Sequence, residues 1–127
     1  LERVALNMMD SKQPDNDGYI PNEEPINIET PAALFTNIPI KSLRAAIEEQ
    51  GISVKISNSC GLYVCNRLYY EALMLCKKYH MKSIFIHLPF YEGQPSAKPN
   101  KPTMPQNDMV KAIQTIIEKI NDKYREF

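Results

Sequence analysis

The chain has 127 residues, of which 43% are hydrophobic and 24% charged, as is typical of one compact soluble domain. Its 15 basic residues balance 15 acidic ones, and a net charge of zero argues against nucleic acid as the main partner. No apolar run is long enough to cross a bilayer and no signal peptide is visible, so we expect no membrane partner. An odd number of cysteines, 3, without framework spacing favours reduced thiols and a cytoplasmic location.

The N-terminal part of the chain reads as a strand followed by a long loop. Residues 3–9 are mostly apolar and predict a buried strand. Residues 10–31 are polar and rich in Pro, Asn, Asp and Gly, which favour turns. A connection of this length is more often functional than filler, and the alternative is a disordered acidic loop. Because the chain starts at Leu1 directly in a strand, we expect it to be an internal fragment of a longer protein.

Two amphipathic helices are predicted on either side of the central region. The first covers residues 40–50, with Gly51 placed to end it and with an apolar face of Ile40, Leu43 and Ile47. The second follows a proline-rich loop over residues 90–105 and is expected to begin at Asn107 as its N-cap. Its apolar stripe would consist of Val110, Ile113, Ile117, Ile120 and Tyr124.

The central region reads as a strand, a helix and a second strand. The strands are predicted over residues 53–57 and 83–88, and the helix over residues 62–79. Such a unit makes a right-handed crossover, so we expect the two strands to be parallel. The predicted fold class is therefore α/β, with helices on both faces of the sheet. The helix face toward the sheet would contain Val64, Leu68, Ala72, Leu75, Cys76 and Tyr79.

Cys65 and His87 are the candidate reactive pair. In parallel α/β sheets, sites form beyond the carboxyl ends of the strands, and both residues lie at such ends. Cys65 is also close to a helix N-terminus, where free amide groups and the helix dipole favour a thiolate. A thiol and an imidazole brought together are a nucleophile and its base. The alternative for Cys65 is a small buried core residue.

The other cysteines and His80 have simpler interpretations. Cys76 is expected in the core, Cys60 in a loop before the helix, and His80 on the surface at the helix C-terminus. A zinc site built from these residues and Cys65 is an alternative, but no C-x-x-C pair supports it, so we predict no metal and no cofactor. An imidazole base also needs an acceptor to orient it. The candidate acceptors are Glu2, Asp10, Asp15, Asp17 and Glu92.

Four sequence blocks resemble pyroglutamyl peptidase type I, also called pyrrolidone-carboxylate peptidase. They are Glu-Arg-Val-Ala-Leu-Asn from Glu2, Pro-Asp-Asn-Asp-Gly from Pro14, Ser-Asn-Ser-Cys-Gly-Leu-Tyr-Val-Cys-Asn from Ser57 and Phe-Ile-His-Leu-Pro from Phe85. The resemblance covers essentially the whole chain. It implies a three-layer α/β/α sandwich with a mixed, mostly parallel sheet, of the phosphorylase/hydrolase-like kind, without its N-terminal strands. Residues 1–127 would be one domain, the C-terminal part of a longer peptidase domain.

The resemblance also implies a reaction, the hydrolysis of an N-terminal pyroglutamyl residue from a peptide. Cys65 would be the nucleophile, His87 the base and then the acid, and Glu2 the group that orients the imidazole. Tyr63 and Val64 would line the pocket for the lactam ring. The implied protein is a cytoplasmic thiol protease and a homo-oligomer, either a dimer or a tetramer.

Two positions depart from the family pattern. Where the family has an arginine and then an apolar residue before Pro-Asp-Asn, this chain has Lys12 and Gln13. These residues belong to the expected substrate-binding set, and a lysine does not reproduce the planar fork of an arginine. The alternative function is therefore a truncated or non-catalytic relative that binds or assembles without turnover.

Overall fold

The computed structural model describes residues 1–95 and 97–125, the last three without their side chains, and the chain divides into two compact units. The first unit contains Leu1–Ile38 and Ile56–Phe85. The second contains Pro39–Lys55 and the chain from Ile86 onward. In the part of the chain that the structure describes, no helix is both long and apolar enough to cross a membrane.

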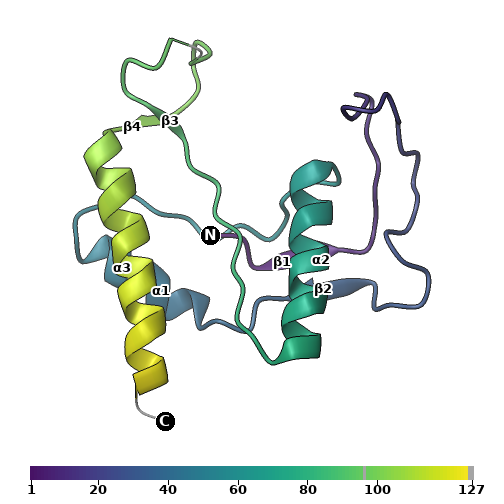
Figure 1. Ribbon diagram of the computed structural model, residues 1–127. Helices are drawn as coiled ribbons and strands as arrows, with labels where there is room; N and C mark the ends of the chain where they lie inside the picture. Colours follow the sequence, from purple (N-terminus) through teal and green to yellow (C-terminus); the bar gives the residue numbers. More distant parts are fainter. Residues whose placement is uncertain (96, 126–127) are drawn as a thin grey trace. The chain divides into compact units, whose positions relative to one another are not determined.

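The first unit is built from two short strands and a long helix. Strand β1 (Val4–Leu6) pairs antiparallel with strand β2 (Ala33–Phe35), and Ala5 lies opposite Leu34. Helix α2 (Val64–Tyr79) packs across both strands, as Figure 1 shows. The combination of helix and sheet confirms the α/β class. Strand β1 lies inside the predicted run 3–9, whereas β2 was not predicted.

Glu2 extends β1 and is paired through its backbone on both sides. It forms a parallel bridge with Ser57 and an antiparallel bridge with Phe85. The segments around Ser57 and Phe85 therefore run in opposite directions beside Glu2. The prediction that these two segments are parallel strands is therefore wrong. Continuous strands were expected over residues 53–57 and 83–88, but each segment forms only a single bridge. The same bridges give Glu2, just before β1, a backbone partner on each side.

The face that α2 buries differs from the predicted one. Tyr69, Tyr70 and Leu73 are buried and join Ala5 in the core of the first unit. Cys76 is buried, as predicted, and Ala72 is half-buried. The remaining members of the predicted stripe are more than half exposed, namely Val64, Leu68, Leu75 and Tyr79. The helix has two apolar stripes, and the aromatic one faces the sheet because it fills more volume against β1.

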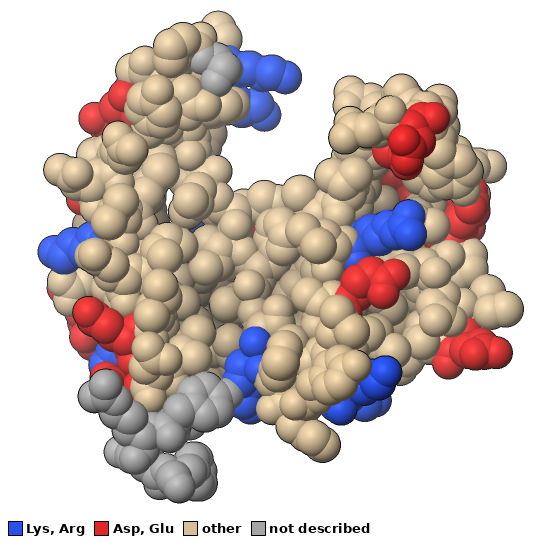
Figure 2. Space-filling model, viewed as in Figure 1, with Lys and Arg blue, Asp and Glu red and all other residues tan. Residues whose placement is uncertain are grey.

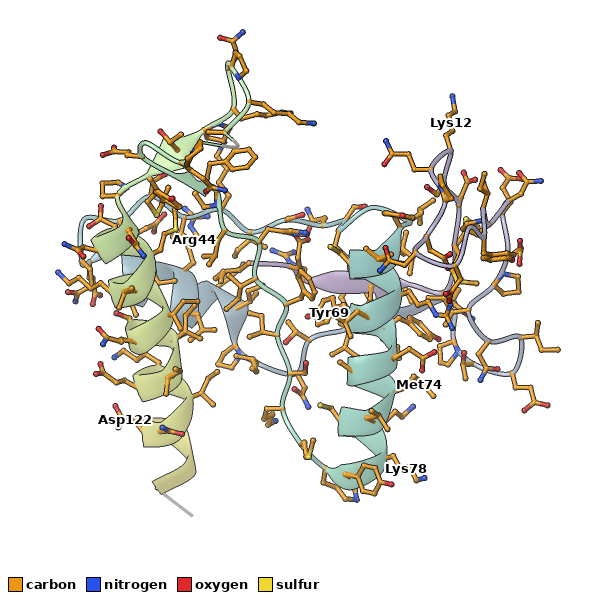
Figure 3. The ribbon with its side chains drawn as sticks, turned by 45° about the horizontal axis from the view of Figure 1, so that its top comes forward. Lys12, Arg44, Tyr69, Met74, Lys78 and Asp122 are labelled. Atoms are coloured by element: carbon orange, nitrogen blue, oxygen red, sulfur yellow. The ribbon has the colours of Figure 1, made fainter. Side chains whose placement is uncertain are left out.

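Tyrosine hydroxyl groups tie α2 to the rest of the first unit. The Tyr69 hydroxyl donates a hydrogen bond of 3.1 Å to the Glu2 carbonyl. The Tyr70 hydroxyl lies 2.5 Å from the Pro31 carbonyl and 2.9 Å from the Thr30 hydroxyl. In Figure 3, Tyr69 leaves α2 on the side of β1. Because a buried hydroxyl without a partner is costly, these hydrogen bonds fix which helix face is buried.

The second unit is mainly two helices that pack together. Helix α1 (Ile40–Glu48) confirms the predicted helix and its buried face of Ile40, Leu43 and Ile47. Gly51 has a φ of 75°, the left-handed conformation expected for a residue that ends a helix. Helix α3 (Gln106–Arg125) packs against α1 (Figure 1).

Three details of the C-terminal region correct the prediction. Helix α3 begins at Gln106, so Asn107 lies inside the helix and is not its N-cap. Its buried residues are Met109 and Ile116, whereas Val110 and Ile117 are more than half exposed. Ile113 and Ile120 are half-buried, and the side chain of Tyr124 lies outside the described residues. The predicted loop 90–105 also contains two short parallel strands, β3 (Phe90–Tyr91) and β4 (Thr103–Met104).

Candidate active site

Cys65 is the second residue of α2 and is half-buried. The helix begins after Tyr63, whose backbone is extended and whose side chain makes no capping hydrogen bond. The first amide groups of a helix have no partner within the helix, so they favour negative charge nearby. This confirms the predicted location of Cys65 at a helix start.

Glu2 supplies a carboxylate in the interior of the first unit. Its side chain is only 4% exposed, and its backbone is fixed by the bridges to Ser57 and Phe85. Of the other candidate acids in this unit, Asp15 accepts hydrogen bonds from the backbone of a turn, and Asp10 and Asp17 are exposed. Glu92 belongs to the second unit. Glu2 is therefore the buried member of the candidate set.

Cys60 is half-buried, and the pKa of its thiol is raised above the ordinary value. Burial is the main cause that raises the pKa of the Cys60 thiol, and the Glu2 carboxylate raises it further. A smaller increase comes from Cys65. The Cys60 sulfur lies 3.5 Å from the side-chain oxygen of Asn66 and 3.8 Å from the Val4 carbonyl. The thiolate form of Cys60 is therefore disfavoured, and its thiol is a poor nucleophile.

The loop that contains Lys12 and Gln13 is fastened to the start of α2. The Asp10 backbone N–H donates to the Leu62 carbonyl at 3.0 Å. The Tyr63 hydroxyl donates to the Pro14 carbonyl at 2.6 Å. Lys12 and Gln13 lie between these two attachments and are both exposed. Figure 3 shows Lys12 at the outer end of this loop, directed away from α2.

The remaining predicted site residues lie at the surface or in the other unit. Val64 is the first residue of α2 and is about half exposed, at 51%. His87 is exposed and belongs to the second unit, so the first unit contains Glu2 and Cys65 without it. His80 is exposed at the end of α2, as expected. Within the described part of the chain, no three His, Cys, Asp or Glu side chains are grouped as metal ligands.

Two features of the site were missed by sequence reasoning. Asn66 is completely buried beside Cys65 and makes hydrogen bonds to β1. A polar residue directly after the cysteine, in the first turn of an apolar helix, was the available signal. The second feature is the attachment of Tyr63 to Pro14, which joins the helix start to a loop far away in sequence.

The surface near the site carries charges of both signs. Over α2 and the loop beside it, acidic and basic residues are interspersed on the face drawn in Figure 2. The first unit therefore presents no continuous basic stripe on this face of the kind that binds a phosphate backbone.

Comparison with known proteins identifies relatives along nearly the whole chain. The family model described as "Pyroglutamyl peptidase" matches residues 1–123. Pyrrolidone-carboxylate peptidase 1 of Caldanaerobacter subterraneus subsp. tengcongensis is 45% identical over 122 residues, which are 94% of this chain and 60% of that protein. The pyrrolidone-carboxylate peptidase of Streptococcus pyogenes serotype M3 is 42% identical over 123 residues, which are 95% of this chain and 57% of that protein.

A solved structure gives the same result at the level of the fold. Pyrrolidone carboxyl peptidase from Thermococcus litoralis aligns with a TM-score of 0.90 and 32% identity, over 98% of this chain and 60% of that chain. The chain therefore spans about 60% of the length of the relatives that it matches. Since the family model extends from Leu1 almost to the C-terminus and includes Glu2, Cys65 and His87, the chain belongs to the pyroglutamyl peptidase family.

Proposed function

We propose that the protein is a cysteine peptidase that removes an N-terminal pyroglutamyl residue from peptides. The observation that carries this proposal is the combination of Cys65 at the start of α2 with the buried carboxylate of Glu2 in the same unit. Both residues belong to the first unit, where Glu2 is buried and Cys65 is half-buried. Membership of the pyroglutamyl peptidase family supplies the substrate class.

In the proposed reaction, the Cys65 thiolate attacks the carbonyl carbon of the pyroglutamyl residue. His87 accepts the thiol proton and then gives a proton to the leaving amine, which leaves an acyl-enzyme. Water, deprotonated by His87, hydrolyses the thioester and restores the thiol. Glu2 holds the imidazole in the required tautomer and stabilises its positive form. The backbone N–H of Cys65 is suited to stabilise the oxyanion, because it lies in the first turn of α2.

The chain connectivity supports His87 as the base in this proposal. His87 follows Phe85 by two residues, and Phe85 is bonded through its backbone to Glu2 at 2.9 Å. Two residues extend at most about 7 Å, so the Cα atom of His87 stays within that distance of Phe85.

We propose that Tyr63 and Val64 contact the lactam ring and that Lys12 and Gln13 form part of the wall beside it. The attachments of the loop at Leu62 and at Tyr63 support this, because they hold residues 10–14 beside the helix start. An uncharged ring with one N–H and one C=O suits a small apolar slot with a few backbone partners. The departures at Lys12 and Gln13 would lower the rate relative to a family member with arginine, since lysine is not its geometric equivalent.

We also propose that both units form one peptidase domain, the C-terminal part of a three-layer α/β/α sandwich with a mixed, mostly parallel sheet. The family match across both units and the pairing of Glu2 on both sides support this. We propose a cytoplasmic protein, supported by the free thiols of Cys60, Cys65 and Cys76, and a homo-oligomer, either a dimer or a tetramer, supported by the exposed apolar stripe of α2.

The test is the release of a fluorescent amine from a pyroglutamyl amide. We expect turnover by the unaltered protein, loss of it in Cys65→Ser and His87→Ala, and little change in Cys76→Ser. The matched cysteine control separates catalysis from a general need for thiols. Absence of turnover by the unaltered protein, with the reporter cleaved by a family member under the same conditions, would contradict the proposal and favour the non-catalytic alternative.

A further inference from the structure

Asn66 is a buried polar residue whose entire hydrogen-bonding capacity is used. It is 0% exposed. Its side-chain oxygen accepts from the Leu6 backbone N–H at 2.9 Å, and the Cys60 thiol lies 3.5 Å from the same oxygen. Its side-chain nitrogen donates to the Leu6 carbonyl at 2.8 Å and to the Met8 carbonyl at 3.0 Å. An asparagine amide has two donors and two acceptor sites, so every one has a partner.

These hydrogen bonds make the amide of Asn66 a substitute for a neighbouring strand. Leu6 both donates to and accepts from the same side chain, as a residue in a sheet does with a residue of the next strand. The partner comes from the first turn of α2 instead of a strand. Asn66 therefore links the helix start rigidly to the end of β1, and a fully satisfied buried polar group of this kind specifies one arrangement.

The link between Asn66 and Leu6 concerns the proposed reaction because it joins the segments that carry Cys65 and Glu2. Cys65 directly precedes Asn66 in the first turn of α2. Glu2 lies two residues before β1, the strand that contains Leu6, and its backbone is fixed by its bridges. A shift of the helix start along β1 would move the nucleophile relative to the carboxylate. Displacements of about 1 Å in such a site can lower a rate by about 10²-fold.

We propose that Asn66 is a positioning residue for the nucleophile, which holds Cys65 in register with the strand that bears Glu2. This role rests on the proposed peptidase function. Asn66 acts through the backbone of α2 and touches neither the substrate nor the reacting atoms. Its effect belongs to the chemical step, so its loss reduces kcat while KM changes little.

The competing explanation is that Asn66 only stabilises the fold. Leu73 provides the matched control, because it is a buried residue of the same helix, 5% exposed, two turns farther from the site. Leu73→Ala leaves a cavity in the core of the first unit without touching the link to Leu6. A role in stability alone would make Asn66→Ala and Leu73→Ala behave alike once both are folded.

The experiment compares the unaltered protein, Asn66→Ala and Leu73→Ala with a pyroglutamyl amide reporter, at a temperature where circular dichroism shows each to be folded. We expect kcat to fall about 10²-fold in Asn66→Ala with KM within about threefold, and kcat to stay within about threefold in Leu73→Ala. Asn66→Ser, which leaves a smaller cavity and keeps one hydroxyl, serves if Asn66→Ala does not fold. Equal kcat values for the folded Asn66 and Leu73 variants overturn the proposal.

A second measurement keeps this inference separate from the proposed function. If the unaltered protein releases no amine, the peptidase function fails, and alkylation of Cys65 by iodoacetamide at neutral pH, followed by mass spectrometry, decides the role of Asn66. Only a thiolate reacts, and its rate depends on how its surroundings expose and orient the sulfur, which a displaced helix start would change. We expect alkylation of Cys65 to slow several-fold in Asn66→Ala and to stay unchanged in Leu73→Ala. Identical rates in the two variants overturn the positioning role.

Discussion

The hydroxyl of Tyr63 donates a 2.6 Å hydrogen bond to the carbonyl of Pro14. These residues are 49 positions apart in the sequence. The hydrogen bond joins the residue two before Cys65, the proposed nucleophile, to the loop that contains Lys12 and Gln13. Because the loop is attached again through Asp10 and Leu62, its course beside the helix start is defined at both ends. The candidate substrate-binding residues of the first unit are therefore held by a specific tertiary contact.

Tyr63→Phe tests this attachment. We expect KM for a pyroglutamyl amide to rise about fivefold with kcat within about twofold, because a lost hydrogen bond of about 1 kcal/mol loosens the loop without moving Cys65. Steady-state kinetics give both constants. Tyr79→Phe is the control, since Tyr79 is 58% exposed at the far end of α2. An unchanged KM in Tyr63→Phe would show that the loop does not contribute to substrate binding.

Glu2→Gln tests the role of the buried carboxylate. The change keeps the shape of the side chain but removes the charge that we propose orients the His87 imidazole, so we expect kcat to fall by about 10²- to 10⁴-fold with KM little changed. The matched control is Glu29→Gln, an exposed acid in the loop of the same unit. Wild-type kcat in a folded Glu2→Gln variant would assign the orienting role to another group.

Leu73→Ala and Leu68→Ala test which face of α2 is buried. Leu73 is 5% exposed and lies in the core, so its truncation should lower the free energy of unfolding by about 2–5 kcal/mol. Leu68 is 64% exposed, and the same truncation should change it by less than about 0.5 kcal/mol. Urea unfolding curves of the two variants give both values. A larger loss of stability in Leu68→Ala than in Leu73→Ala would instead support the buried face predicted from the sequence.

The pH dependence of Cys60 follows from its raised pKa. Burial and the nearby Glu2 carboxylate disfavour the thiolate, so we expect alkylation of Cys60 to keep accelerating at pH values where a free cysteine peptide has levelled off. The stabilisation linked to this thiol is complete below its ordinary pKa and is lost as pH rises through the raised value. Mass spectrometry of residue-resolved alkylation checks this. A Cys60 profile identical to that of the peptide, measured on the folded protein, would contradict it.

The sequence by itself determined the local features whose cause lies within a few neighbouring residues. The apolar face of Ile40, Leu43 and Ile47 repeats with the helical period, and Gly51 is the residue type that adopts the left-handed conformation, so helix α1 was predictable. The location of Cys65 at a helix start was predictable for the same reason. The sequence blocks and their order were sufficient to indicate the family, because such a resemblance depends on residue identity and not on packing.

Only the tertiary structure decided which of several locally equivalent choices the molecule adopts. Helix α2 has one apolar stripe through Leu68 and another through Tyr69, and the periodicity is the same for both. The stripe through Tyr69 is buried because its hydroxyl reaches the Glu2 carbonyl and its ring packs at 5.7 Å from that of Phe85. The strand directions at Ser57 and Phe85 and the link from Asn66 to Leu6 likewise depend on residues far apart in the chain. Such contacts leave no periodic signal in the sequence, because their partners are chosen by hydrogen-bond satisfaction and packing in three dimensions.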